Sequence, residues 1–110
     1  MLRKTNPLVP LRMNLRARMW FHLVRRGSVK PAPFYQILGT DARGAKAHLE
    51  AQFQPGMSWE NYGQWHVDHI TPLASAKTPE ELVALCHYTN LQPLWAADNI
   101  RKGAKIERRP

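Results

Sequence analysis

The sequence of 110 residues is long enough for one domain with a small core, and its single cysteine excludes an internal disulfide and a zinc knuckle built on cysteines. No apolar run is long enough to span a bilayer, which excludes an integral membrane protein of the helical kind and leads us to expect cytoplasmic residence. The formal net charge of +8 favours a polyanionic partner such as a nucleic acid.

The charges are unevenly distributed along the chain. Residues 1–40 contain eight Lys and Arg and no acid, whereas residues 41–100 contain three basic and seven acidic residues. Residues 101–110 are again basic, with five Lys and Arg against one Glu. Basic ends around an acidic middle suit a protein that binds a polyanion and acts on it at a cation-binding centre. The alternative is a basic surface that is merely solvated.

The N-terminal region is predicted to be an arm followed by a helix. Pro7 and Pro10 favour an extended arm over residues 1–10. A helix is expected from there to Gly27, so that residues 1–30 form a basic arm and helix. Apolar residues four positions apart would form its buried face, namely Leu11, Leu15, Met19 and Leu23.

Two further helical segments are expected before the middle of the chain. Residues 34–38 resemble a short helical turn that ends at Gly39. Thr40 or Asp41 could cap the next helix, which is expected to continue through Phe53.

The remaining chain predicts a strand, a helical insertion, a strand and a helix. Residues 65–70 have the pattern of a short strand, and a helix follows Thr78, which is placed to cap it. Residues 91–95 form the second strand, an edge or irregular one because it contains a proline. The last helix is expected over residues 96–102, with Gly103 as its stop.

The pair Asp68–His69 carries the residue types that phosphodiester hydrolysis requires. A neutral imidazole can serve as the base that activates water, and carboxylate and amide oxygens suit hard divalent cations. In a regular strand these neighbours would point to opposite faces, so we expect the backbone to turn there if they share a site. Thr71 and Pro72 follow directly.

Three short motifs carry a family resemblance. They are D-H-I-x-P-L at 68–73, N-L-Q-P-L at 90–94 and D-N-x-x-K-G at 98–103. In residue type, order and spacing they resemble the HNH endonucleases, particularly the short phage and prophage members. The resemblance covers residues 54–105, which would be the HNH core of a single nuclease domain over residues 1–110.

The resemblance implies an α+β fold with a ββα-metal (HNH, His-Me finger) core and additional N-terminal helices. It gives His69 the role of general base, Asp68 and Asn99 the role of metal ligands, and Asn90 that of holding the loop that carries the base. His66, two residues before Asp68, is a further candidate ligand. The expected cofactor is one divalent metal ion, Mg²⁺ or Mn²⁺, with Zn²⁺ and Ni²⁺ as alternatives.

Many relatives have two cysteine pairs that bind a structural zinc ion, and this chain cannot form such a site. We therefore expect packing to hold its strands together, with Trp65, Leu94 and Trp95 as the candidate side chains.

The expected function is metal-dependent hydrolysis of phosphodiester bonds in DNA, most simply a duplex, with a homodimer or phage packaging machinery as further partners. The alternative is a basic nucleic-acid-binding module without catalysis, such as a phage DNA-packaging accessory or regulator. The candidate contacts to phosphate are basic residues of the first and last helices, namely Arg12, Arg16, Arg25, Arg26, Arg101, Lys102 and Lys105.

Overall fold

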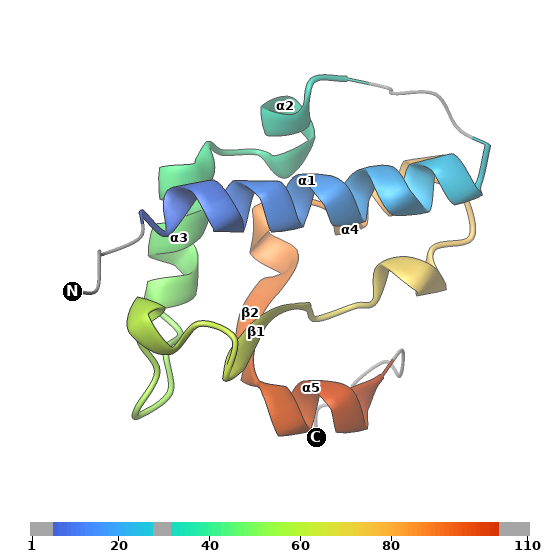
Figure 1. The fold of residues 1–110 in the computed structure, drawn as a ribbon. Coiled ribbons are helices and arrows are strands. Elements are labelled where there is room, and N and C mark those ends of the chain that lie inside the picture. Colours follow the sequence, from blue (N-terminus) through green and yellow to red (C-terminus); the bar gives the residue numbers. More distant parts are fainter. Residues whose placement is uncertain (1–5, 28–31, 104–110) are drawn as a thin grey trace.

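The computed structural model of the chain describes residues 6–27 and 32–103 (Figure 1). Within these residues the chain forms helices around a two-stranded antiparallel sheet, so the expected α+β class is confirmed. The main elements in chain order are α1 (Leu8–Arg25), α2 (Phe34–Leu38), α3 (Ala42–Glu50), β1 (Trp65–His69), α4 (Pro79–Leu85), β2 (Leu91–Trp95) and α5 (Ala96–Lys102).

The two strands form the frame of the C-terminal half. β1 pairs with β2 so that Trp65 lies opposite Trp95 and His69 lies opposite Leu91. α5 starts directly after β2, and α4 lies in the segment that joins the strands. The expected order of strand, helical insertion, strand and helix is therefore confirmed. Pro93 is tolerated in β2 because a two-stranded sheet has only edge strands.

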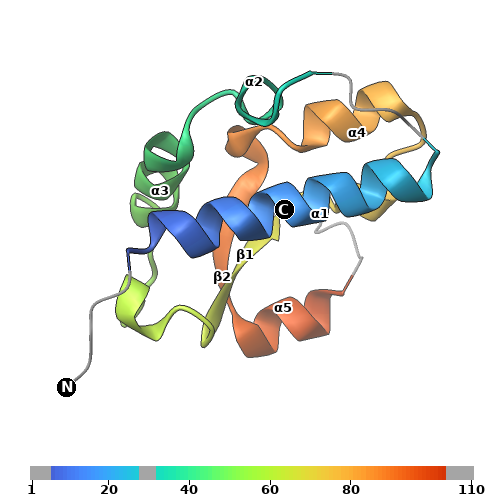
Figure 2. The ribbon, with the colours of Figure 1, turned by 45° about the horizontal axis from the view of Figure 1, so that its top comes forward.

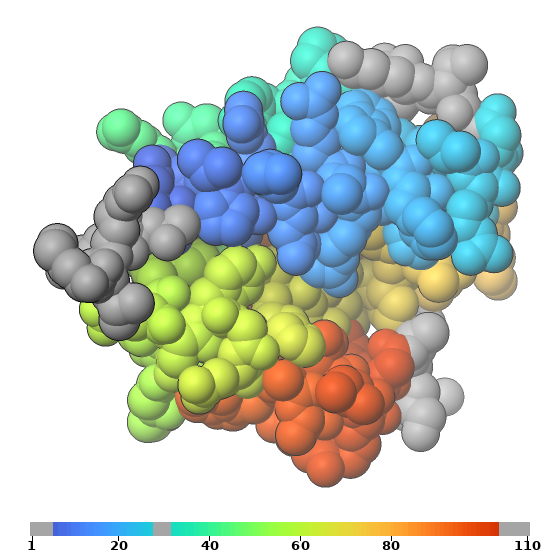
Figure 3. Space-filling view, in the orientation of Figure 1, coloured from blue at the N-terminus to red at the C-terminus, as the bar shows by residue number. Residues whose placement is uncertain are grey.

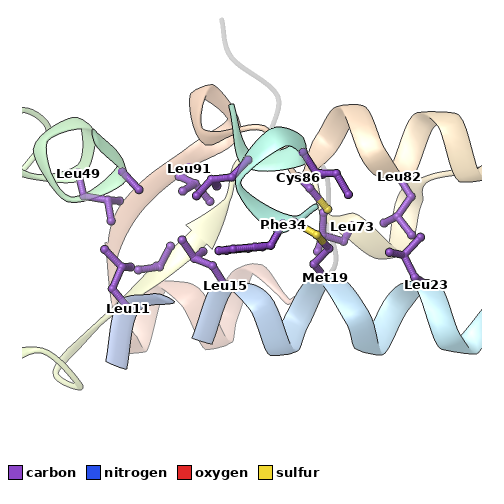
Figure 4. Close-up of a cluster of buried hydrophobic side chains, with 14 of the residues drawn as sticks. Leu11, Leu15, Met19, Leu23, Phe34, Leu49, Leu73, Leu82, Cys86 and Leu91 are labelled. Carbon is purple, nitrogen blue, oxygen red and sulfur yellow. The ribbon is translucent and has the colours of Figure 1, made fainter. Parts of the chain in front are cut away.

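α1 supplies one long side of the hydrophobic core. The four side chains expected on its buried face are at most 4% exposed. They project from one side of the helix toward side chains of α2, α3 and α4 and the second strand (Figure 4). An apolar residue every fourth position keeps one stripe of a helix against the core over its whole length, which explains the agreement.

The start of α1 differs from the prediction. The helix begins at Leu8, so the part of the expected arm that the structure describes after Pro7 is already helical. Pro10 lies in the first turn, where backbone N–H groups have no acceptor within the helix, so its missing N–H costs nothing there.

The third helix is shorter than expected. α3 is capped by Asp41, whose side chain accepts a hydrogen bond from the amide of Gly44 at 2.9 Å, but it ends at Glu50. Phe53 lies beyond its end and packs against Trp59 and Trp65. These tertiary contacts draw Phe53 away from the helical stripe.

An aromatic cluster stabilises the start of the hairpin. Trp65 is fully buried, and its ring lies 4.8 Å from that of Tyr62, 5.0 Å from that of Phe53 and 5.1 Å from that of Trp59. Its indole N–H donates to the carbonyl of Ser58 at 2.7 Å. These contacts pack the start of β1 against the segment before it. Leu94 and Trp95, the other side chains expected to hold the strands together, are partly buried.

α1 and α5 lie on opposite sides of β1. In both ribbon views α1 crosses the sheet near its upper end and α5 lies below it (Figure 2). α5 contacts both strands, and the described surface is hollowed between the two helices (Figure 3).

Candidate functional site

The candidate site is a cleft of about 320 Å³ between α1, the end of β1 and α5. Asp68 and His69 contribute from β1, Asn99 from α5 and Arg18 from α1. Of the five site residues expected from the sequence, the three that line this cleft are Asp68, His69 and Asn99.

The expected turn between Asp68 and His69 is not present. β1 continues through His69, and the chain bends at residues 70–71. Both side chains still line the cleft because it lies at the end of the strand, where α1 covers one side and α5 the other. Proximity here comes from the packed helices and does not require a break in the strand.

His69 is a buried histidine with an unpaired ring nitrogen. It is 5% exposed, and its Nδ1 is the one buried side-chain nitrogen or oxygen in the described part of the chain that has no hydrogen-bond partner. Burial lowers the pKa of His69 to about 3, and the nearby charge of Arg18 acts in the same direction. The imidazole is therefore neutral at pH 7, which is the form that can accept a proton.

Asp68 forms a buried ion pair with Lys102. The ammonium group donates to Oδ2 of Asp68 at 2.6 Å, and the two side chains are only 7% and 5% exposed. Gln92 donates to the same oxygen at 2.9 Å. Among the described residues no group donates to Oδ1 of Asp68, so this oxygen is available to a further cation or donor.

The same geometry corrects the expectation for Lys102. Its ammonium group also donates to the carbonyls of His69 at 2.8 Å and Ile70 at 3.1 Å. With three acceptors and little exposure, Lys102 holds the end of β1 against α5. It does not present its charge to a phosphate at the surface.

His66 and Asn99 form a second pair beside the first. The amide nitrogen of Asn99 lies 2.8 Å from Nδ1 of His66. His66 and Asp68 are two residues apart on β1 and so belong to the same face of the strand. Both members of this pair, with Arg18, also line an adjoining cleft of about 490 Å³.

Asn90 fastens the loop that follows His69. Its amide donates to the carbonyls of Thr71 at 3.0 Å and Leu85 at 2.8 Å, and its side-chain oxygen accepts from the amide of Thr71 at 3.0 Å. Its backbone carbonyl accepts from the amide of Ile70 at 2.8 Å. Asn90 therefore positions the backbone beside His69 and does not itself line the cleft.

The residues that could contribute to a cation site come from both clefts. Asp68 and Asn99 line the first cleft and carry oxygens of the kind that hard divalent cations prefer, whereas His66 lines the adjoining cleft with Asn99. No group of three or more His, Cys, Asp or Glu that could hold a metal occurs in the part of the chain that the structure describes. A cation here would thus have few protein ligands and would keep positions open for oxygens of a substrate.

The expected basic contacts are scattered over the surface. Arg12 lies in a separate surface hollow with Tyr35, and Arg16 is exposed and lines none of the described hollows near the site. Arg101 is exposed and pairs with Asp98 one turn away. Lys105 lies outside the described residues.

Arg25 and Arg26 are better placed. They line a hollow of about 270 Å³ that adjoins the cleft through His22. Arg26 also donates to the carbonyl of Ala76, which ties the end of α1 to the loop after β1.

Arg18 and His22 were missed by the sequence argument although both line the cleft. The available signal was their spacing. Asn14, Arg18 and His22 are four residues apart, one position before each residue of the buried stripe from Leu15 onward. Polar residues on that ridge lie at the border between the core and the surface, which is where a cleft forms.

Comparisons with known proteins assign no family. No family model matches the chain, and no solved structure matches it. Over 74 residues the chain is 39% identical to an uncharacterized protein of Acanthamoeba polyphaga mimivirus. The match covers 64% of this chain and 33% of the mimivirus protein, so the chain spans about one third of the length of that relative. Every helix within residues 6–27 and 32–103 is too short or too polar to cross a bilayer.

Proposed function

We propose that the chain is a metal-dependent endonuclease that hydrolyses phosphodiester bonds in DNA, and that β1, β2 and α5 form a ββα-metal core of the HNH type. The observation that carries the proposal is the cleft that His69, Asp68 and Asn99 line together, in which Nδ1 of His69 is buried without a hydrogen-bond partner. A polar atom buried without a partner is rare in a folded protein, and a catalytic role is one reason for a protein to keep it.

In this mechanism His69 takes the proton from the water that attacks the phosphorus. Burial keeps its imidazole neutral, but the low pKa also makes it a weak proton acceptor. An anionic phosphate in the cleft would oppose the effect of Arg18 and raise that pKa. Asn90 contributes by holding the backbone after His69.

Asp68, Asn99 and His66 are the side chains that would hold the cation. When bound, the cation would stabilise the negative charge that develops on the phosphate and on the departing 3′ oxygen. The products would carry 5′-phosphate and 3′-hydroxyl ends. Lys102 fixes the position of Asp68 through the ion pair on Oδ2.

The test is incubation of supercoiled plasmid with the purified protein in Mg²⁺, Mn²⁺ or EDTA. Nicking or linearisation that requires the cation and is lost in His69→Ala is the expected result. His87→Ala is the matched control, because His87 does not line the cleft. Equal cleavage by wild type and His69→Ala would refute the role of His69.

The second candidate is a DNA-binding module without catalysis. The observation that favours it is the buried pair of Asp68 and Lys102, because a carboxylate already neutralised by an ammonium group has less need of a metal ion. Salt-sensitive binding to DNA without cleavage in any divalent cation would support this candidate over the nuclease.

A further inference from the structure

Arg18 occupies the junction of the two clefts at the candidate site. It lines the cleft of about 320 Å³ with His69 and the cleft of about 490 Å³ with His66, and Asn99 is the other residue that the two share. The guanidinium group of Arg18 is thus next to both polar pairs of the site.

The position of this guanidinium group is fixed by neutral acceptors. Nη1 donates to the carbonyl of Val67 at 2.6 Å and to Oδ1 of Asn14 at 3.3 Å. No Asp or Glu of the described chain forms an ion pair with Arg18. The negative charge of Asp68 acts on Arg18, but Asp68 is itself paired with Lys102.

The charge of Arg18 is therefore held in place but not neutralised. Within residues 6–27 and 32–103 all its hydrogen bonds use Nη1, so the other guanidinium N–H groups remain for a ligand. A planar guanidinium with free donors matches the oxygens of a phosphodiester and can bind two of them at once.

The hollows beside Arg18 continue along α1. The cleft with His69 shares His22 and Ala74 with the hollow that Arg25 and Arg26 line. The three hollows thus follow one another along the polar ridge of α1, and the space-filling view shows the recess below this helix (Figure 3). Such a series suits an extended chain of phosphates better than a small anion.

We propose that Arg18 binds a backbone phosphate of the DNA strand at the junction of the clefts, and that the strand follows the ridge of α1 formed by Asn14, Arg18, His22 and Arg26. The assignment of this phosphate to the bond that is cut rests on the proposed nuclease function. The binding itself does not. This proposal places the DNA contact on residues of α1 beside the core, and not on the outward arginines Arg12 and Arg16.

The experiment measures binding of a labelled DNA oligonucleotide by fluorescence anisotropy in EDTA, where cleavage does not interfere. Arg18→Gln is compared with Arg16→Gln, which removes the same charge from an exposed position on the same helix. Arg18→Gln is expected to weaken binding by about tenfold, as for the loss of one charge-assisted hydrogen-bonded contact. It should also lower the slope of log K against log salt by about one, whereas Arg16→Gln changes affinity by less than about threefold.

Arg18→Lys tests whether the arrangement of the donors matters in addition to the charge. It keeps the charge but loses the fork of donors, so its affinity should lie between those of wild type and Arg18→Gln. Circular dichroism and a urea midpoint establish that each variant is folded. Equal weakening by Arg18→Gln and Arg16→Gln would overturn the proposal, as would wild-type affinity in folded Arg18→Gln.

The result of the binding experiment does not depend on whether the protein cleaves plasmid DNA. If Arg18→Gln selectively loses DNA binding and the wild-type protein cuts no plasmid, phosphate binding by Arg18 is supported and the nuclease function is refuted. If Arg18→Gln binds DNA normally and the wild-type protein cuts DNA through His69, the nuclease function is supported and phosphate binding by Arg18 is refuted.

Discussion

Replacement of Lys102 by Met tests the central electrostatic feature of the site. The substitution keeps the aliphatic stem but removes the ammonium group that lies 2.6 Å from Asp68. Because both side chains are at most 7% exposed, water cannot replace the lost partner, and Asp68 keeps an uncompensated buried charge. Breaking a buried pair in this way costs about 3–5 kcal/mol of the free energy of unfolding.

The chain offers a matched control in Lys46→Met. Lys46 and Glu50 are also 2.6 Å apart, but their side chains are 29% and 39% exposed. Since the separation is the same, the difference between the two variants measures burial. Lys46→Met should cost less than about 1 kcal/mol because solvent screens an exposed pair.

Urea unfolding of the purified variants gives these free energies. The double variant Lys102→Met with Asp68→Asn should recover part of the loss, because the buried charge is then gone as well. Mn²⁺ should stabilise Lys102→Met more than wild type if a cation can take the place of the ammonium beside Asp68. A cost below about 1 kcal/mol for Lys102→Met, or no recovery in the double variant, would refute the reasoning.

Two further predictions concern stability. Asn90→Ala removes the side-chain hydrogen bonds to Thr71 and Leu85 and should lower the free energy of unfolding by about 2–3 kcal/mol. A loss below about 1 kcal/mol in urea unfolding would show that Asn90 does not hold the loop after His69. Burial raises the pKa of the Cys86 thiol from 9.0 to about 11, so the unfolded chain releases this proton first as pH rises. The stability present below pH 9 should fall by about 2–3 kcal/mol between pH 9 and pH 11. The fall should be smaller in Cys86→Ala, and equal falls in the two proteins would show that other groups cause it.

Local patterns predicted most of the secondary structure because they report local physics. The four-residue spacing of apolar side chains on α1 and the cap at Thr78 act within a turn or two of helix, and both are present in the structure. The prediction was wrong where distant contacts compete. Phe53 follows the helical stripe in the sequence, yet the ring of Trp65 holds it outside α3.

The sequence by itself determined which residue types are available for chemistry. It placed Asp68 next to His69, and Asn99 one turn into a helix that follows a strand, and those three side chains line one cleft. It also predicted the order of elements that brings them together, since an antiparallel pair followed at once by a helix leaves that helix few places to pack.

Only the tertiary structure decided how each charge is used. Lys102 and Arg101 are neighbours at the end of one helix, yet one is buried against Asp68 and the other is exposed. Arg18 and Arg16 are two residues apart, yet only Arg18 reaches the clefts. The direction of a helical side chain relative to a distant element depends on how the helices pack around β1, and that packing is a property of the whole chain.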